Sequence, residues 1–384
     1  MYIGGPGEAA RLMEAVGVNA DGVRIMEQKA AFRTILVKGL SAGAANVVKQ
    51  QMLSLGGDAA VASGVVNCSV DESDALLMGT EKQILRLAES LAYQPFGLPS
   101  LGEELRKIIG PKPTTLICAG RELSLERPLV MGILNVTPDS FSDGGEFFDA
   151  ETAVARAREI LDQGTDIIDV GGESTRPGSA YVDEDEELRR VMPVVEAVAS
   201  DTVVSIDTRK SAVARKALDA GAAMVNDVSA GRDDPGVAGA AAEFGAALVL
   251  MHMLGTPADM QVDPRYDDVV SEVRDFLAER AEWVRSEGVE SVVVDPGIGF
   301  GKTLDHNLEL LRNIPAITDL GYPVLVGHSR KSFIEKLLGL PVEERLASSL
   351  AVAVEATRRG ANILRVHDVK ETVEAIAMVG ALRR

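Results

Sequence analysis

The sequence has little positive charge and few aromatic residues. Its 384 residues include 39 Lys and Arg against 58 Asp and Glu, and the formal net charge is -19 at pH 7. This balance argues against nonspecific binding to nucleic acid or to an anionic membrane, since both need a basic surface. A small anionic ligand is compatible with it, because a local cluster of Arg and Lys can overcome the global field. Aromatic residues make up only 4% of the chain, so aliphatic residues must form the core, which favours packed helix and sheet layers over a β-sandwich.

Cysteines and long apolar runs are also scarce. The two cysteines, Cys68 and Cys118, lack the CxxC spacing of a metal or redox site. We expect two reduced thiols, as in a cytoplasmic protein. The start of the chain lacks the basic and apolar regions of a signal peptide. No apolar run approaches the roughly 20 residues of a membrane span. The sequence therefore predicts a cytoplasmic protein without a membrane partner.

What the sequence does have is a repeated alternation of strand-like and helix-like segments. Apolar, β-branched runs end in polar residues and are followed by Ala-, Glu- and Arg-rich stretches, many of which end in Gly. There are eight such runs, at 129–135, 166–172, 203–207, 224–227, 247–252, 291–297, 322–329 and 362–368. Eight β/α units over about 250 residues predict a (β/α)8 TIM barrel. A doubly wound open sheet is the alternative, although it usually has fewer strands.

Residues 1–120 have a different pattern, which predicts a small α+β domain ahead of the barrel at 121–384. Strands are expected at 34–40, 58–67 and 74–80, and helices at 41–57 and 81–94. The segment 110–128 is interpreted as the connection into the barrel. This first domain shows no chemical constellation, so we expect a structural, regulatory or assembly role for it.

Polar residues follow the apolar runs, where the strands of such a barrel carry their chemistry. Asp207, Asn226 and Asp295 end three different strands. Each could merely cap a helix or pair with a neighbour. Together they are better explained by a ligand rich in N–H donors, such as an amino-substituted heterocycle, because a carboxylate can accept two parallel N–H bonds.

A second, cationic group follows the last two strands. Arg330 and Lys331 come after the seventh strand, and Arg365 and His367 share one face of the eighth. This corner of the barrel commonly binds phosphate, so we predict a phosphate or pyrophosphate site rather than a solvated basic patch.

The glycine-rich segment 295–303 lacks the P-loop pattern. Phe300 within it could stack on a flat substrate or simply pack in the loop. His252 could be a supporting or a merely structural rim residue. No histidine pair has zinc spacing.

Seven motifs carry a family resemblance. They are "GILNVTPDSFSDGG", "DVGGESTRPG", "SIDT", "VNDVS", "DPGIGFGKT", "GHSRKSF" and "RVHDV". In order and spacing they are similar to those of dihydropteroate synthases, and the resemblance covers residues 128 to about 380. It implies a TIM-barrel transferase of folate biosynthesis. This enzyme condenses 6-hydroxymethyl-7,8-dihydropterin pyrophosphate with 4-aminobenzoate, giving 7,8-dihydropteroate and pyrophosphate. It also implies a homodimer through barrel helices.

The resemblance assigns roles to the matching residues of this sequence. Asp207, Asn226, Asp295 and Lys331 would hold the pterin. Arg365 and His367 would bind the pyrophosphate, and Asn135 would contact its Mg2+ ion. The 4-aminobenzoate side would be formed by Thr175, Arg176, Pro177, Phe300 and Ser332. Asp143 lies in the polar segment that follows the first strand and would close over the site as part of a lid. Among these, Asp143, Arg176 and Lys331 are the expected catalytic residues.

Other functions fit parts of the pattern. A pterin-dependent methyltransferase would share the Asp and Asn pocket but would have no use for the pyrophosphate corner. A synthase for a different arylamine would share every motif. A catalytically silent binding protein would not need the complete set of rim residues.

Overall fold

The computed structural model describes residues 6–137, 150–174, 181–256 and 259–383. The chain divides into two compact units, Met1–Pro111 and Lys112–Arg384, each with its own hydrophobic core. The segment 112–120 thus goes with the second unit. No helix among the described residues is both long and apolar enough to cross a membrane.

The first unit is an α+β domain built on a three-stranded antiparallel sheet of order β1-β3-β2. Its elements are α1 (Pro6–Ala15), α2 (Ala20–Ala30), β1 (Phe32–Ser41), α3 (Ala42–Ser54), β2 (Asp58–Val61), β3 (Glu72–Thr80), α4 (Glu81–Leu91) and α5 (Leu98–Ile109). Apolar side chains of α3, α4 and α5 form one buried cluster with Ala59, Ala75 and Leu77 of the sheet. The α+β prediction is confirmed, although β2 is shorter than expected and a 3-10 turn, Ser63–Val65, follows it.

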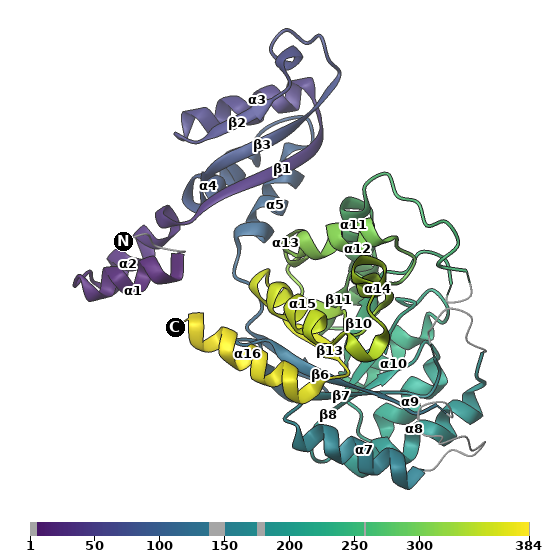
Figure 1. Cartoon of the computed structure of the whole chain (residues 1–384). Helices are drawn as coiled ribbons and strands as arrows, with labels where there is room; N and C mark the ends of the chain where they lie inside the picture. Colours follow the sequence, from purple (N-terminus) through teal and green to yellow (C-terminus); the bar gives the residue numbers. More distant parts are fainter. Residues whose placement is uncertain (1–5, 138–149, 175–180, 257–258, 384) are drawn as a thin grey trace. The chain divides into compact units, whose positions relative to one another are not determined.

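The second unit is a barrel of eight parallel strands (Figure 1). The strands are β6 (Leu129–Asn135), β7 (Ile167–Gly171), β8 (Val203–Asp207), β9 (Met224–Asp227), β10 (Ala247–Met251), β11 (Val292–Asp295), β12 (Leu325–Gly327) and β13 (Ile363–Val366). Seven neighbouring pairs are hydrogen-bonded in a row, and a parallel bridge between Val294 and Val324 closes the ring. Each of the eight apolar runs therefore forms a strand, and the predicted TIM barrel is confirmed.

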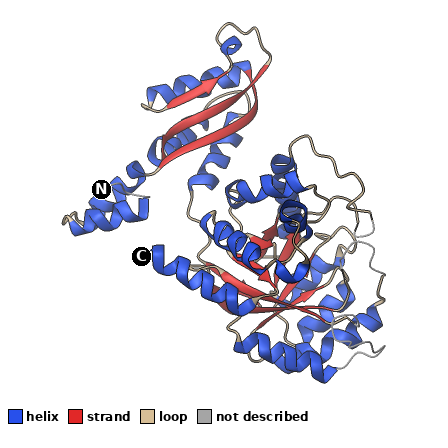
Figure 2. Cartoon of the chain, viewed as in Figure 1, coloured by secondary structure: helices blue, strands red, loops and turns tan. Residues whose placement is uncertain are grey.

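Helices surround the barrel, as Figure 2 shows in blue. They are α7 (Ala150–Asp162), α8 (Glu184–Val198), α9 (Ser211–Asp219), α10 (Gly236–Phe244), α11 (Val269–Ser286), α12 (Leu304–Arg312), α13 (Ile314–Thr318), α14 (Ser332–Leu338), α15 (Leu346–Arg358) and α16 (Val369–Arg383). Several begin at polar caps. At the start of α12, Thr303 and His306 form a reciprocal capping box, which gives His306 a structural role.

A short hairpin closes the amino-terminal end of the barrel. It consists of β4 (Thr115–Cys118) and β5 (Arg121–Ser124). Leu116 and Cys118 are buried with the apolar side chains inside the barrel. The hairpin is anchored because Arg121 donates hydrogen bonds to two carbonyls of the α8–β8 connection. The opposite end of the barrel, at the carboxyl ends of the strands, carries the polar side chains.

Candidate active site

Strand alternation divides the barrel interior into an apolar and a polar layer. Inward-facing side chains lie two residues apart along each strand. The inward positions nearer the amino-terminal ends of the strands are apolar. They belong to one buried cluster that includes Met131, Ile167, Val203, Met224, Val293, Leu325 and Ile363. Two or four residues further along, the same face carries polar groups. These are Asn135, Asp169, Asp207, Asn226, Asp295 and Arg365.

A network of hydrogen bonds joins four of these polar residues. The Arg365 guanidinium donates through Nε to Asp169 Oδ2 and through Nη2 to Asp207 Oδ2, each at 2.6 Å. Asn226 donates to the same Asp169 oxygen at 3.0 Å. Asp169 Oδ1 is buried and has no hydrogen-bond partner in the part of the chain that the structure describes. The centre of the barrel therefore contains a guanidinium fixed between two carboxylates.

Burial changes the acidity of the carboxylates in this layer. It raises the pKa of Asp207 to about 7, although Arg365 acts in the opposite direction. The pKa of Asp295 is also raised by burial, against the effect of Lys331. Its Oδ1 accepts a hydrogen bond from the Gly297 N–H at 2.7 Å. Perturbed carboxylates in a concave polar layer are typical of a functional site.

Lys331 and Phe300 lie together at the mouth of the barrel. The Lys331 ammonium lies 4.5 Å from the centroid of the Phe300 ring and donates to the Ile298 carbonyl. Burial lowers the pKa of Lys331 to about 8, while Asp295 acts to raise it. A Cβ placed on Gly327 would lie within 4 Å of both Lys331 Nζ and Asp295 Oδ2. The structure thus places Lys331, Phe300 and Asp295 next to each other.

The cationic corner is partly neutralised by carboxylates. Arg330 makes two hydrogen bonds to Asp368, and Arg365 is bound to Asp169 and Asp207. His367 contacts Ser329 Oγ through both its backbone N–H and its ring Nδ1. Arg330 has a left-handed backbone, with φ of 56°, and the Ser349 hydroxyl and Arg345 guanidinium hold its N–H and carbonyl. Such a conformation in a non-glycine residue costs free energy and often marks a functional turn.

The structure describes two of the remaining predicted residues. Ser332 is exposed at the first position of α14, and Asn135 is half-buried at the end of β6. Four predicted residues lie outside the described residues: Asp143, Thr175, Arg176 and Pro177. Their roles stay predictions.

The sequence reasoning missed two buried residues that the structure brings to the site. Asp169 stands in the middle of the apolar run of β7, and only its inward position relates it to Arg365. Lys302 is 1% exposed and contacts His252 and Phe300. Lys302 lies within the glycine-rich segment 295–303, but its partner His252 is 50 residues away in the sequence.

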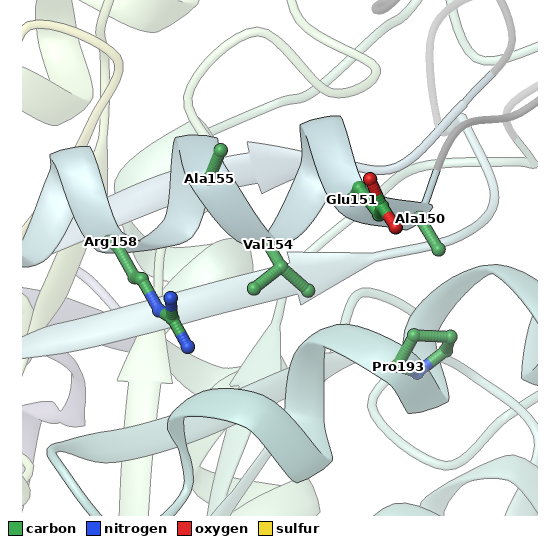
Figure 3. Close-up of a pocket in the computed structure, with 6 residues that line it drawn as sticks. All are labelled: Ala150, Glu151, Val154, Ala155, Arg158 and Pro193. Atoms are coloured by element: carbon green, nitrogen blue, oxygen red, sulfur yellow. The ribbon is translucent and has the colours of Figure 1, made fainter.

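A separate hollow of about 400 Å³ lies between α7 and α8, outside the barrel (Figure 3). It is lined by Ala150, Glu151, Val154, Ala155, Arg158 and Pro193. None of the predicted site residues that the structure describes lines it. The candidate active site is therefore the polar layer inside the barrel and not this hollow.

Comparisons with known proteins identify relatives of the barrel unit. The family model described as "Pterin binding enzyme" matches residues 131–367. A dihydropteroate synthase from Escherichia coli (strain K12) is 49% identical over 270 residues, which are 69% of this chain and 95% of that protein. The solved dihydropteroate synthase of Xanthomonas albilineans with 4-aminobenzoic acid has a TM-score of 0.66 at 48% identity and covers 70% of this chain and 98% of that one.

A longer relative also matches the N-terminal unit. A probable bifunctional folylpolyglutamate synthase/dihydropteroate synthase from Halobacterium salinarum is 44% identical over 381 residues. The match takes in 98% of this chain and 46% of that protein. The chain therefore spans less than half the length of this relative, and the shared part includes the N-terminal unit.

Proposed function

The chain belongs to the dihydropteroate synthase family of pterin-binding enzymes, and on that premise we propose that it condenses 6-hydroxymethyl-7,8-dihydropterin pyrophosphate with 4-aminobenzoate. The products are 7,8-dihydropteroate and pyrophosphate. The observation that carries the proposal is the polar layer inside the barrel, where Asp169 and Asp207 accept hydrogen bonds from the Arg365 guanidinium and Asn226 donates to Asp169.

The acceptors suit the pterin ring. A pterin presents a row of N–H donors along its aminopyrimidine edge, and carboxylates can accept such donors in pairs. Asp207, Asn226 and Asp295 lie at three strand ends with their side chains directed inward, and Lys331 lies beside Asp295. The ring would replace water at these groups.

The leaving group requires positive charge and a metal. Arg365 and His367 would hold the pyrophosphate. Asn135 would contribute an amide oxygen to a Mg2+ ion, which prefers oxygen ligands. No group of three or more His, Cys, Asp or Glu among the described residues could hold an ion by itself. That fits an ion that takes most of its ligands from phosphate and water. Bound there, magnesium would neutralise charge on the departing pyrophosphate.

The chain's own residues would favour a dissociative substitution. The bond between the exocyclic carbon and the pyrophosphate oxygen breaks first, and the positive charge on that carbon spreads into the pterin ring. The carboxylates of Asp207 and Asp295 stabilise this charge at close range. The neutral amine of 4-aminobenzoate then forms the C–N bond and releases a proton to water, so no strong base is needed.

The 4-aminobenzoate would bind beside Phe300 and Ser332. The Phe300 ring offers a flat apolar surface for the arylamine ring, and the ammonium of Lys331, the residue assigned to the pterin, lies 4.5 Å from the centroid of that ring. Thr175, Arg176 and Pro177 would complete this side, and Asp143 would close over it. Two closing segments would exclude water, which competes with the amine.

A turnover assay tests the proposal. The full chain is given the pterin pyrophosphate with 4-aminobenzoate or another arylamine, with and without Mg2+, and pyrophosphate release is measured. Release that depends on 4-aminobenzoate supports the proposal. Release only with a different arylamine would favour the alternative synthase, and methyl transfer without pyrophosphate release would favour the methyltransferase.

We also propose that the protein is a cytoplasmic homodimer that contacts through barrel helices. Support comes from the family resemblance and from the cysteines, since Cys68 and Cys118 form no disulfide. Sedimentation of the full chain tests the dimer, and a monomer at assay concentration would refute it. Fractionation of the source cells tests the location.

A further inference from the structure

The loop between β11 and α12 is held by side chains instead of by regular secondary structure. Four consecutive carbonyls, from Ile298 to Gly301, each accept a hydrogen bond from a different side chain. The donors are Lys331 to Ile298, Gln261 to Gly299 at 2.8 Å, Lys302 to Phe300 at 2.9 Å and Tyr266 to Gly301 at 2.8 Å. Lys302 belongs to the loop itself, Gln261 and Tyr266 to the connection between β10 and α11, and Lys331 directly precedes α14, so the loop is bound to two other parts of the barrel.

Lys302 is the most deeply buried of these donors. It is 1% exposed, and among the described residues its amino group hydrogen-bonds to uncharged acceptors. Lys302 Nζ lies 2.9 Å from the Phe300 carbonyl, 3.0 Å from His252 Nδ1 and 3.3 Å from the His252 carbonyl. These three acceptors surround the amino group of Lys302. The side chain thereby ties the end of β10 to the loop.

The contact between Lys302 and His252 avoids a repulsion of like charges. Burial lowers the pKa of His252 to about 2, with a further lowering from Lys302. Burial also lowers the pKa of Lys302 well below its ordinary value. The imidazole is therefore neutral, and its Nδ1 can accept a hydrogen bond from Lys302.

The Phe300 ring depends on the loop for its position. One side of it packs against the buried cluster of Met251, Met253 and Met260, and its face meets the Lys331 ammonium. The loop also lies tightly against Lys331, since a Cβ on Gly299 would come within 2.9 Å of Lys331 Cδ. A shift of the Phe300 carbonyl would therefore move the ring relative to Lys331.

We propose that Lys302 is a positioning residue that sets the Phe300 ring for the arylamine substrate. The inference rests on the proposed function, because it needs an arylamine at Phe300. The pterin acceptors Asp207, Asn226 and Asp295 are residues of strands β8, β9 and β11, and Asp295 meets this loop through the Gly297 N–H and not through Lys302. Loss of Lys302 should therefore weaken the arylamine site and spare the pterin site.

Steady-state kinetics of Lys302→Met tests the inference. The substitution keeps an apolar stem and leaves the Phe300 carbonyl without its donor. We expect the KM for 4-aminobenzoate to rise about tenfold, the factor set by an unpaired buried hydrogen-bonding group. The KM for the pterin pyrophosphate should stay within about twofold. Lys112→Met is the matched control, because Lys112 also donates to a carbonyl, that of Thr318, but on the outside of the barrel.

A second pair of variants covers the case in which Lys302→Met does not fold. His252→Asn keeps an acceptor near the Nδ1 position, whereas His252→Leu removes it. The Asn variant should keep the KM for 4-aminobenzoate and the Leu variant should raise it. Folded variants with both KM values unchanged would overturn the inference while leaving the proposed function intact. An equal rise in both KM values would show a merely structural role. No turnover by the unaltered chain would remove both proposals.

Discussion

Arg365 on β13 and Asp169 on β7 are joined by a 2.6 Å hydrogen bond inside the barrel. The same guanidinium binds Asp207, so one arginine links inward side chains of three strands. This ion-paired group lies directly above the apolar layer. It fixes the directions of the carboxylates before any ligand binds, which lowers the reorganisation that binding requires.

The Arg365–Asp169 pair gives the first prediction. In Asp169→Ala the buried Arg365 guanidinium loses one of its two carboxylate partners and keeps only Asp207. We expect the free energy of unfolding to fall by about 3 kcal/mol, as for other broken buried pairs, measured by urea denaturation. Asp319→Ala is the matched control, since Asp319 pairs with Lys112 where the side chains are 31% and 41% exposed. That variant should lose less than about 1 kcal/mol. Equal losses in the two variants would contradict the prediction.

The buried ionisable groups predict a bell-shaped pH dependence. The pKa of Asp207 is raised to about 7 and that of Lys331 is lowered to about 8, both chiefly by burial. Asp207 gains a proton as the pH falls below 7 and then accepts fewer donors from the pterin. Lys331 loses its proton as the pH rises above 8. We therefore expect kcat/KM for the pterin pyrophosphate to be highest between these values and to fall on both sides.

The alkaline side of this profile can be assigned with one substitution. In Lys331→Arg the side chain at this position stays positively charged to much higher pH, because a guanidinium group does not deprotonate in this range. The alkaline decline should disappear in this variant, while the acid side stays. Lys112→Arg should show the unaltered profile. A wild-type profile that stays flat from pH 6 to about 10 would show that neither group titrates as described.

Removal of divalent metal tests the proposed place of Asn135. Chelation should abolish turnover, and added Mg2+ should restore it. Asn135→Ala should raise the Mg2+ concentration needed for half-maximal turnover about tenfold, as loss of groups around a metal commonly does. Asn313→Ala, which alters an exposed asparagine bonded to Glu309, should leave that concentration unchanged. Full activity after chelation would refute a metal role.

Much of the fold could be predicted because the barrel strands are continuous apolar runs with glycine or polar residues at their ends. All eight matched within a few residues. The helices α1, α2 and α5 and the β4–β5 hairpin were not predicted. The strands β4 and β5 lack the continuous buried run of the barrel strands, because every second residue in them is exposed, and four residues are too few to establish that alternation from sequence. The hairpin is stabilised by its packing against the apolar layer inside the barrel, and the local sequence pattern does not reveal such a long-range contact.

The carboxylate and amide acceptors of the candidate site could be predicted where a polar residue ended an apolar run. Asp207, Asn226 and Asp295 met that condition. Asp169 did not, because apolar residues stand on both sides of it. Which face of β7 its side chain occupies relates it to the site only once the strands have formed the barrel. Lys302 acts through contacts with His252 and Phe300 that depend on how β10 approaches the next loop. Those relationships arise from tertiary packing.

The hairpin at the base of the barrel gives the last prediction. Leu116 and Cys118 are buried against the interior layer, and Arg121 binds carbonyls of Ala199 and Thr202. A chain that begins at Lys112 should keep the turnover of the full chain, since the first unit has a separate core.

A chain that begins at Arg127 would instead lose the hairpin and expose the lower layer. Each large apolar side chain that loses its cover costs about 1.5–3 kcal/mol, so we expect unfolding at clearly lower urea concentration. Leu116→Ala in the full chain should show the same direction, with a loss of about 3 kcal/mol. Val66→Ala, at a side chain 72% exposed in the first unit, is the control. If the shorter chain unfolded at the same urea concentration as the longer one, the hairpin would not belong to the barrel's core, and the apolar layer would have to be stable when open to water.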